Sequence, residues 1–213
     1  MTSTEGLRER KKRLMRQQLS DTAARLFLER GFAAVPVAAV AEACGVSVKT
    51  VFNYFPTKEA LLLDRLEETA RALRTELARP DRTSLDAVLG LLAVELAGQV
   101  SSFSSGEDPS AAMSAYRRFG DLIRDTPSLR AYRNDMADRF VTMAAEALAE
   151  RAGTDPDDPE AQITAAALVG LWRVQASSIR RHLVAELPPD RLRDAVTADV
   201  HQAAALLSRG LPA

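Results

Sequence analysis

The strongest constraint on the fold is that apolar residues recur at helical spacing along nearly the whole chain, in segments that end at Pro or Gly. Near the N-terminus, Leu19, Ala23, Leu26 and Phe27 share one helix face, and Gly31 is placed to end that helix in a left-handed conformation. No sustained alternation of apolar and polar residues predicts a strand. The sequence therefore predicts an all-α fold with about nine helices, at residues 7–30, 37–44, 48–54, about 57 to 79, 83–104, 110–125, 128–152, 159–187 and 189–208.

Length and composition predict a globular protein. The 213 residues are 46 % apolar and 27 % charged, which suffices for a sizeable core. No apolar run approaches the ~20 residues that span a bilayer, and the N-terminus leads into charge instead of a signal peptide. The single Cys44 cannot form an internal disulfide, and we read it as a small buried apolar residue, not a redox sensor. We expect a soluble, cytoplasmic protein.

The net charge of −1 conceals an asymmetry. Residues 1–60 hold ten Lys or Arg against six Asp or Glu, whereas the rest of the chain holds 18 against 23. A basic N-terminal part on an acidic body indicates that a polyanion meets the N-terminal part. A solvated charged surface is the alternative, so the charge is informative only together with a motif.

Residues 37–54 carry that motif, a helix-turn-helix. Two predicted helices, each too short to be stable alone, are separated by Gly45-Val46-Ser47. Val40, Ala41 and Cys44 form an apolar face on the first helix, and Val46, Val51 and Phe55 face it from the turn and the second helix. Gly45 supplies the positive φ that ends the first helix, and Ser47 is placed to cap the second.

A helix-turn-helix inserts the N-terminal part of its second helix into the major groove of DNA. The side chains then available to DNA, together with the capping serine, are Ser47, Val48, Lys49, Thr50, Phe52, Asn53 and Tyr54. Phe52 and Tyr54 have an alternative role as core aromatics, and Lys49 as a solvated lysine.

The run from Val46 to Leu61 resembles the signature of the TetR family of regulators. In that family Gly-Val-Ser opens the recognition helix, and an aromatic pair followed by Lys-Glu-x-Leu opens the next helix. The resemblance covers residues 10–62 and implies that Val48, Lys49, Thr50 and Phe52 face bases or groove walls. It also implies that Tyr54 and Lys58 hold phosphates, with the basic run Arg8–Arg16 near the flanking backbone.

One feature departs from the family. Many relatives begin the first short helix with a capping Thr that also touches phosphate, whereas this chain has Val35-Pro36-Val37 there. We therefore expect less DNA contact from that helix, although Pro suits a first helical turn.

The resemblance also implies a DNA-binding domain at 1–56 and a ligand-binding and dimerisation domain at 57–213, with a homodimer through the last two helices. Small residues that permit close helix packing, Ala161, Ala165, Ala166, Ala167 and Gly170, support this in the penultimate helix. The last helix has one apolar stripe of Val196, Val200, Ala203, Ala204 and Leu207. Packing within one chain is the alternative.

The candidate ligand-binding residues are large or charged side chains on the helices that would surround a cavity. They are Phe103, Met113, Tyr116, Arg117, Phe119, Met136, Phe140, Met143, Trp172 and Arg173. Each has an ordinary core or surface role as its alternative.

The sequence therefore predicts a repressor that binds a palindromic operator as a homodimer and is released by an unknown small molecule. The alternatives are a helix-turn-helix protein with no ligand and, from another class, a small helical enzyme. Against an enzyme, the sequence shows no acid-and-nucleophile pattern near His182 or His201, and we find neither metal-ligand spacing nor a phosphate-binding glycine loop. We expect no cofactor.

Overall fold

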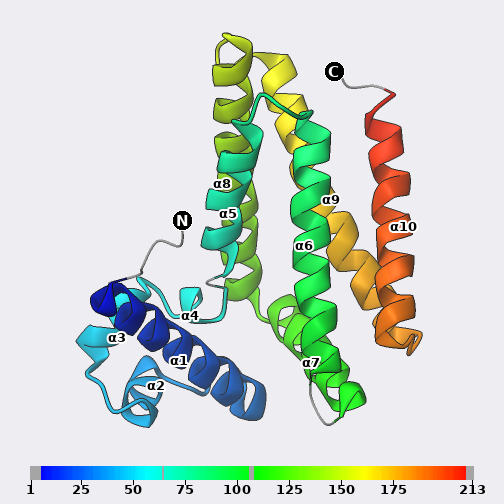
Figure 1. Cartoon of the computed structure of the whole chain (residues 1–213). Helices are drawn as coiled ribbons and strands as arrows, with labels where there is room; N and C mark the ends of the chain where they lie inside the picture. Colours follow the sequence, from blue (N-terminus) through cyan, green and yellow to red (C-terminus); the bar gives the residue numbers. More distant parts are fainter. Residues whose placement is uncertain (1–5, 64, 106–107, 210–213) are drawn as a thin grey trace. The chain divides into compact units, whose positions relative to one another are not determined.

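The computed structural model describes residues 6–63, 65–105 and 108–209, and these form ten helices with no strand (Figure 1). The predicted all-α fold is confirmed. The helices are α1 (Leu7–Arg30), α2 (Val37–Ala43), α3 (Val48–Tyr54), α4 (Ala60–Leu63), α5 (Arg65–Leu77), α6 (Ser84–Ser104), α7 (Pro109–Asp125), α8 (Pro127–Ala152), α9 (Pro159–Val184) and α10 (Pro189–Leu207). The single helix predicted from about 57 to 79 is two helices, α4 and α5, which accounts for the tenth.

By packing, the chain falls into two compact units. The N-terminal unit contains residues up to Leu66 together with 121–133, and the C-terminal unit contains 67–120 and 134 onward. The sequence-based division at residues 56 and 57 stays a prediction of which part binds DNA and which part binds ligand.

The N-terminal unit is built on the second half of α1. Leu19, Ala23, Leu26 and Phe27 are buried there, as predicted, while the first turns of α1 are exposed. The Phe27 ring lies 4.9 Å from the Phe32 ring, between centroids, which packs the loop after α1 onto the helix. The four-residue α4 is buried throughout, and the Ser20 hydroxyl donates to the Leu61 carbonyl at 3.0 Å.

Gly31 ends α1 with a positive φ, but not in the left-handed helical conformation that we predicted. Its φ is 84° and its ψ is 147°, so the chain leaves the helix extended. This combination is open to glycine and strained for other residues. The Gly31 amide still donates to the Phe27 carbonyl at 2.9 Å.

The core of the C-terminal unit is formed by apolar faces of long helices, with α6 packed against both α9 and α10. Leu92 and Leu96 of α6, Leu168 and Leu171 of α9, and Val196 and Val200 of α10 are all buried. Within the described part of the chain, α6 is long and apolar enough to cross a membrane by length and composition alone. No segment of this kind was expected from the sequence. Its packing against two neighbours is that of a helix in a bundle.

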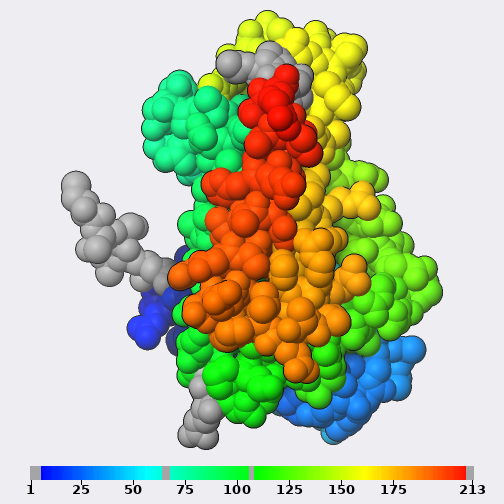
Figure 2. Space-filling view, turned by 90° about the vertical axis from the view of Figure 1, so that its right-hand side faces the viewer, coloured from blue at the N-terminus to red at the C-terminus, as the bar shows by residue number. Residues whose placement is uncertain are grey.

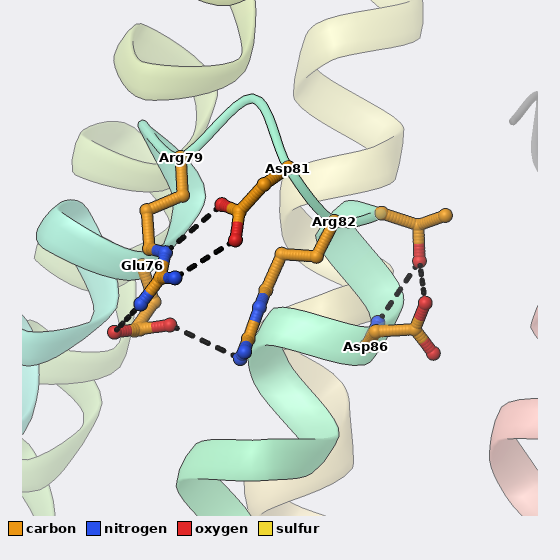
Figure 3. A network of polar contacts seen from close by, with 6 residues as sticks. Glu76, Arg79, Asp81, Arg82 and Asp86 are labelled. Atoms are coloured by element: carbon orange, nitrogen blue, oxygen red, sulfur yellow. Dashed lines mark hydrogen bonds and ion pairs between the residues drawn. The ribbon is translucent and has the colours of Figure 1, made fainter.

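The turn between α5 and α6 is held by ion pairs and a helix cap (Figure 3). Arg79 donates to both carboxylate oxygens of Asp81, at 3.0 and 2.8 Å, and Arg82 lies 3.2 Å from Glu76. Thr83 accepts from the Asp86 amide at 3.1 Å and so caps α6. These contacts fix where α6 begins.

Helices α9 and α10 lie side by side, as Figure 2 shows in orange and red. One carboxylate oxygen of Asp199 on α10 accepts from the Ser178 hydroxyl, the Arg181 guanidinium and, at 3.0 Å, the His182 ring, all on α9. The bond from Ser178, with further bonds from His182 and Arg181, lowers the pKa of Asp199 to about 2. Asp199 therefore ties the two helices together while it is ionised.

We expect Asp199→Asn to destabilise the protein by about 1–2 kcal/mol at pH 7, a value reduced for partial solvent contact. A carboxyl whose pKa is lower in the folded protein stabilises the fold above its unfolded pKa of about 3.9. That stabilisation is lost as the pH falls through 4 towards about 2. Urea unfolding from pH 7 to pH 2 should therefore show a shallower fall in stability for the variant. Asp194→Asn, a more exposed change on the same helix, is the control and should leave the curve unchanged.

Candidate nucleic-acid interface

The turn between α2 and α3 is specified by its hydrogen bonds. Gly45, with φ 67°, donates to the Glu42 carbonyl at 3.0 Å, and Val46 donates to the Ala41 carbonyl at 3.0 Å. This pair of bonds is the Schellman motif, which requires a residue with positive φ after the helix. The predicted role of Gly45 is confirmed. Cys44 is partly exposed, with its sulfur 3.9 Å from the Gln18 carbonyl oxygen, so the prediction that it is buried is wrong.

Helix α3 begins at a serine cap, as predicted. The Ser47 hydroxyl oxygen accepts from the Thr50 amide at 3.0 Å, and the hydroxyls of Ser47 and Thr50 lie 2.8 Å apart. By contrast, α2 begins at Pro36 without a side-chain cap, as expected from the missing Thr. The recognition helix is therefore the better capped of the two.

Val51 and Phe55 anchor α3 with fully buried side chains. At 100° per residue, the direction opposite this anchor is that of Lys49 and Asn53, both exposed. Phe52, with 46 % of its surface exposed, and Val48, with 38 %, lie on one flank. The alternative reading of Phe52 as a core aromatic is therefore excluded.

The other flank of α3 faces the N-terminal part of α1 across a groove of about 850 Å³. Thr50, Asn53 and Tyr54 line it from α3. From α1 it is lined by the cations Arg8, Lys11 and Lys12 and by Leu7 and Met15. Because the three cations are exposed, this groove presents positive charge directly beside the recognition helix.

Arg16 joins α1 to the end of α3. Its guanidinium donates to the Tyr54 carbonyl at 3.0 Å and lies 4.7 Å from the centre of the Phe55 ring. These contacts give Arg16 a structural role, in contrast to the exposed cations one to two turns earlier on α1. The register of α1 against α3 is thereby fixed.

Lys58 is placed differently from the other candidate DNA contacts. Its ammonium donates to the Phe32 carbonyl and lies 4.4 Å from the centre of the Phe32 ring and 5.5 Å from that of Phe27. Burial lowers the pKa of Lys58, with an opposing effect of Glu59. In this structure its charge holds the loop after α1, and a phosphate contact by Lys58 stays a prediction.

The candidate ligand-binding residues all lie in the C-terminal unit. Phe103 is buried and meets the ring of Tyr116 edge-on at 5.4 Å, between centroids. Met136 and Phe140 are buried, Met113, Phe119, Met143 and Trp172 are partly buried, and Arg117 and Arg173 are exposed. The structure thus brings Phe103 and Tyr116 together and places the two arginines at the surface.

Glu95 accepts hydrogen bonds from two other helices and was not among the residues predicted from the sequence. Its carboxylate accepts from the Thr69 hydroxyl of α5 at 2.7 Å and from the Trp172 indole of α9 at 2.9 Å. The sequence does contain a feature that could have indicated it, because Glu95 is the only charged residue in the stretch 87–105. An acidic residue within an apolar helix that packs in a bundle requires partners for its oxygens.

Two short helices with a Schellman turn, an exposed second helix and an adjoining cationic groove define a helix-turn-helix DNA-binding protein. Comparison with known protein families supports this class. The model of bacterial regulatory proteins of the tetR family matches residues 19–64, and that of the MftR C-terminal domain matches residues 99–212. The chain belongs to the TetR family and is a DNA-binding transcriptional regulator.

Individual relatives show the same family. The chain is 32 % identical over 155 residues to the transcriptional regulator TcmR of Streptomyces glaucescens, covering 72 % of this chain and 67 % of TcmR. Over 71 residues it is 41 % identical to LuxR of Vibrio harveyi, covering 33 % and 34 % of the two chains.

Two solved structures share the fold. Thermus thermophilus FadR, a repressor solved with lauroyl-CoA, has a TM-score of 0.52 at 24 % identity, covering 93 % of this chain and 95 % of FadR. The SmeT–triclosan complex has a TM-score of 0.54 at 15 % identity, covering 92 % and 91 %.

Proposed function

We propose that this regulator represses transcription in the cytoplasm by binding a palindromic operator as a homodimer, and that a small molecule releases it. The observation that carries the DNA-binding part is the face of α3 that bears Lys49 and Asn53, beside a groove with three cations. Lys49, Asn53, Val48 and Phe52 reach base edges or groove walls in this proposal. The cations of α1, with Tyr54, hold the phosphates on either side.

Ala165, Val196 and Val200, from which the dimer was predicted, are buried within one chain. Support for a dimer comes instead from the outer surface of α9 and α10. Ile163 and Val184 on α9 and Leu206 on α10 are each more than 60 % exposed. Exposed alanines accompany them on both helices, at positions 166, 176, 198 and 205. Large exposed apolar side chains flanked by small ones suit an isologous four-helix interface, in which backbones approach closely.

We expect the wild-type chain to sediment as a dimer of twice 23.1 kDa at micromolar concentration. Ile163→Asp combined with Leu206→Asp should shift it to the monomer, because burying an unpaired charge costs more than the roughly 2–7 kcal/mol of an unpaired neutral polar group. Val94→Asp is the matched control, since Val94 of α6 is 72 % exposed but lies outside the proposed interface. A wild-type monomer, or dissociation by Val94→Asp, would contradict the dimer through α9 and α10.

A small-molecule effector is supported by the fold, since FadR and SmeT were solved with lauroyl-CoA and triclosan. In this proposal the ligand binds the C-terminal unit and favours a dimer in which the two recognition helices no longer match two half-sites. A ligand acts in this way only through its different affinity for the two states.

The decisive experiment selects DNA fragments with the purified full-length protein and compares Lys49→Ala with wild type. We expect the selected sites to be palindromic. Lys49→Ala should change the preference at one base pair of each half-site by about 1–3 kcal/mol, because a long side chain facing base edges distinguishes donors from acceptors. Lys12→Ala is the control and should weaken all sites equally. Equal loss across all sites for Lys49→Ala would remove it from base recognition.

A further inference from the structure

Glu95 lies among polar side chains in an otherwise apolar part of the C-terminal unit. One helical turn along α6, on the same face, the Gln99 side-chain carbonyl oxygen is buried without a hydrogen-bond partner. On α9, Gln175 is buried three residues after Trp172, which donates to Glu95. Thr69 approaches from α5. Three helices thus bring hydrogen-bonding groups to one place.

The arrangement offers more acceptor than donor capacity. Both hydrogen-bond donors to Glu95 are neutral, and no Lys or Arg of the described residues forms an ion pair with it at 4 Å or less. A buried acceptor without a partner, such as that of Gln99, destabilises a protein. A carboxylate and an amide oxygen on one helix face together complement a group that donates several hydrogen bonds and carries positive charge.

We propose that Glu95 and Gln99 form the polar end of the effector site and select an apolar molecule that bears a protonated amine. This inference rests on the proposed function, because it gives the chemistry of the effector. An apolar ligand body suits this part of the unit, since Leu92, Leu96 and Phe103 of α6 and Leu168 of α9 are buried on the two helices that Glu95 and Trp172 join. Glu95, Gln99 and Trp172 are each partly exposed as residues.

Binding also changes a contact of α5. An ammonium group forms a charge-assisted bond to a carboxylate, which is stronger than the neutral bond from a hydroxyl. The amine therefore adds a stronger bond beside that of the Thr69 hydroxyl on the same carboxylate, at the contact that attaches α5 to α6. α5 is the first helix of the C-terminal unit after the DNA-binding residues in the sequence.

Trp172 makes the test direct, because it is the only tryptophan of the chain and donates to Glu95 itself. The probes are dodecylammonium, 1-dodecanol and dodecanoate, which share one apolar chain and are used below their micellar concentrations. Titration of the full-length protein, followed by Trp172 fluorescence, should give dissociation constants about tenfold or more lower for dodecylammonium than for dodecanoate, with dodecanol between them.

Glu95→Gln keeps the shape of the side chain and should abolish the preference for dodecylammonium over dodecanol. Gln99→Leu should weaken dodecylammonium about tenfold while raising the melting temperature, because it removes a buried acceptor without a partner. Glu150→Gln, the same change at an exposed position of α8, is the control. Far-UV circular dichroism verifies that each variant is folded.

Three results would overturn the proposal: no binding of dodecylammonium, equal binding of dodecanoate, or an amine preference that survives Glu95→Gln. If dodecanol bound as tightly as dodecylammonium, a neutral donor would suffice, and the proposed selectivity for positive charge would also be overturned. None of these measurements uses DNA, so failure here leaves operator binding intact. Failure of operator binding likewise leaves the amine selectivity intact.

Discussion

Replacing Phe55 with Ala is expected to destabilise the N-terminal unit by about 3–5 kcal/mol and to abolish DNA binding. The Phe55 ring is fully buried at the end of α3, and the Arg16 guanidinium packs over it at 4.7 Å. A helix of seven residues is not stable alone, so α3 depends on this anchor and on Val51. Urea unfolding followed by circular dichroism reports both units, whereas Trp172 fluorescence reports the C-terminal unit. The transition followed by circular dichroism should begin at a lower urea concentration than in the wild type. The transition followed by Trp172 fluorescence should change little.

Phe52→Ala is the matched control, because it removes the same kind of side chain three residues earlier, at a position of α3 that is 46 % exposed. Its stability should change by no more than about 0.5 kcal/mol, as for other surface substitutions. Its operator affinity should nevertheless fall, since the ring faces the proposed DNA surface. If Phe55→Ala bound DNA like the wild type, or if both variants lost equal stability, the assignment of the two faces of α3 would be wrong.

The second large effect is expected from neutralising the groove between α1 and α3. Changing Arg8, Lys11 and Lys12 together to Ala should reduce affinity for every DNA sequence on the order of a hundredfold at low salt. The slope of log affinity against log salt should become shallower by about 2–3, because each phosphate contact releases about 0.9 counterions. Stability should be nearly unchanged, because all three side chains are exposed and no residue of the first turns of α1 is buried.

Fluorescence anisotropy of a labelled operator measures the affinity, and repeating it between about 50 and 200 mM salt gives the slope. The control replaces three exposed cations of the C-terminal unit, Arg151, Arg191 and Arg193, and should leave the slope unchanged. An unchanged slope in the groove variant would place the DNA elsewhere than beside these residues.

Most helix ends could be predicted because they depend on local chemistry. The predicted helix at 7–30 agrees with α1 at both ends, and those at 37–44 and 48–54 agree with α2 and α3 within one residue. Pro at the start of α9 and α10, and Gly45 after α2, act through backbone geometry that is independent of distant contacts. The break between α4 and α5 was not predicted, because the apolar run Ala60–Leu63 continues the pattern of the helix that follows.

The faces of α3 could be predicted in part. The spacing of Val51 and Phe55 indicates the buried side, but the exposure of Phe52 depends on where α1 and α2 lie. Thr50 illustrates the limit, because its hydroxyl lies beside that of Ser47 while its side chain lines the groove. From the sequence alone, Thr50 and Lys49 were equal candidates for DNA contact, whereas in the structure Lys49 is exposed and Thr50 is only partly exposed.

The sequence by itself determined the all-α class, the helix-turn-helix and its caps, and the family, since these follow from local spacing and a specific motif. Only the tertiary structure decided which charged groups are available and which are held by neighbours. It placed the ammonium of Lys58 against Phe32, the guanidinium of Arg16 over Phe55, and the carboxylate of Glu95 between Thr69 and Trp172. The physical reason is that the partners of a charge come from residues distant in sequence, 77 positions apart for Glu95 and Trp172, and helical periodicity carries no information about them.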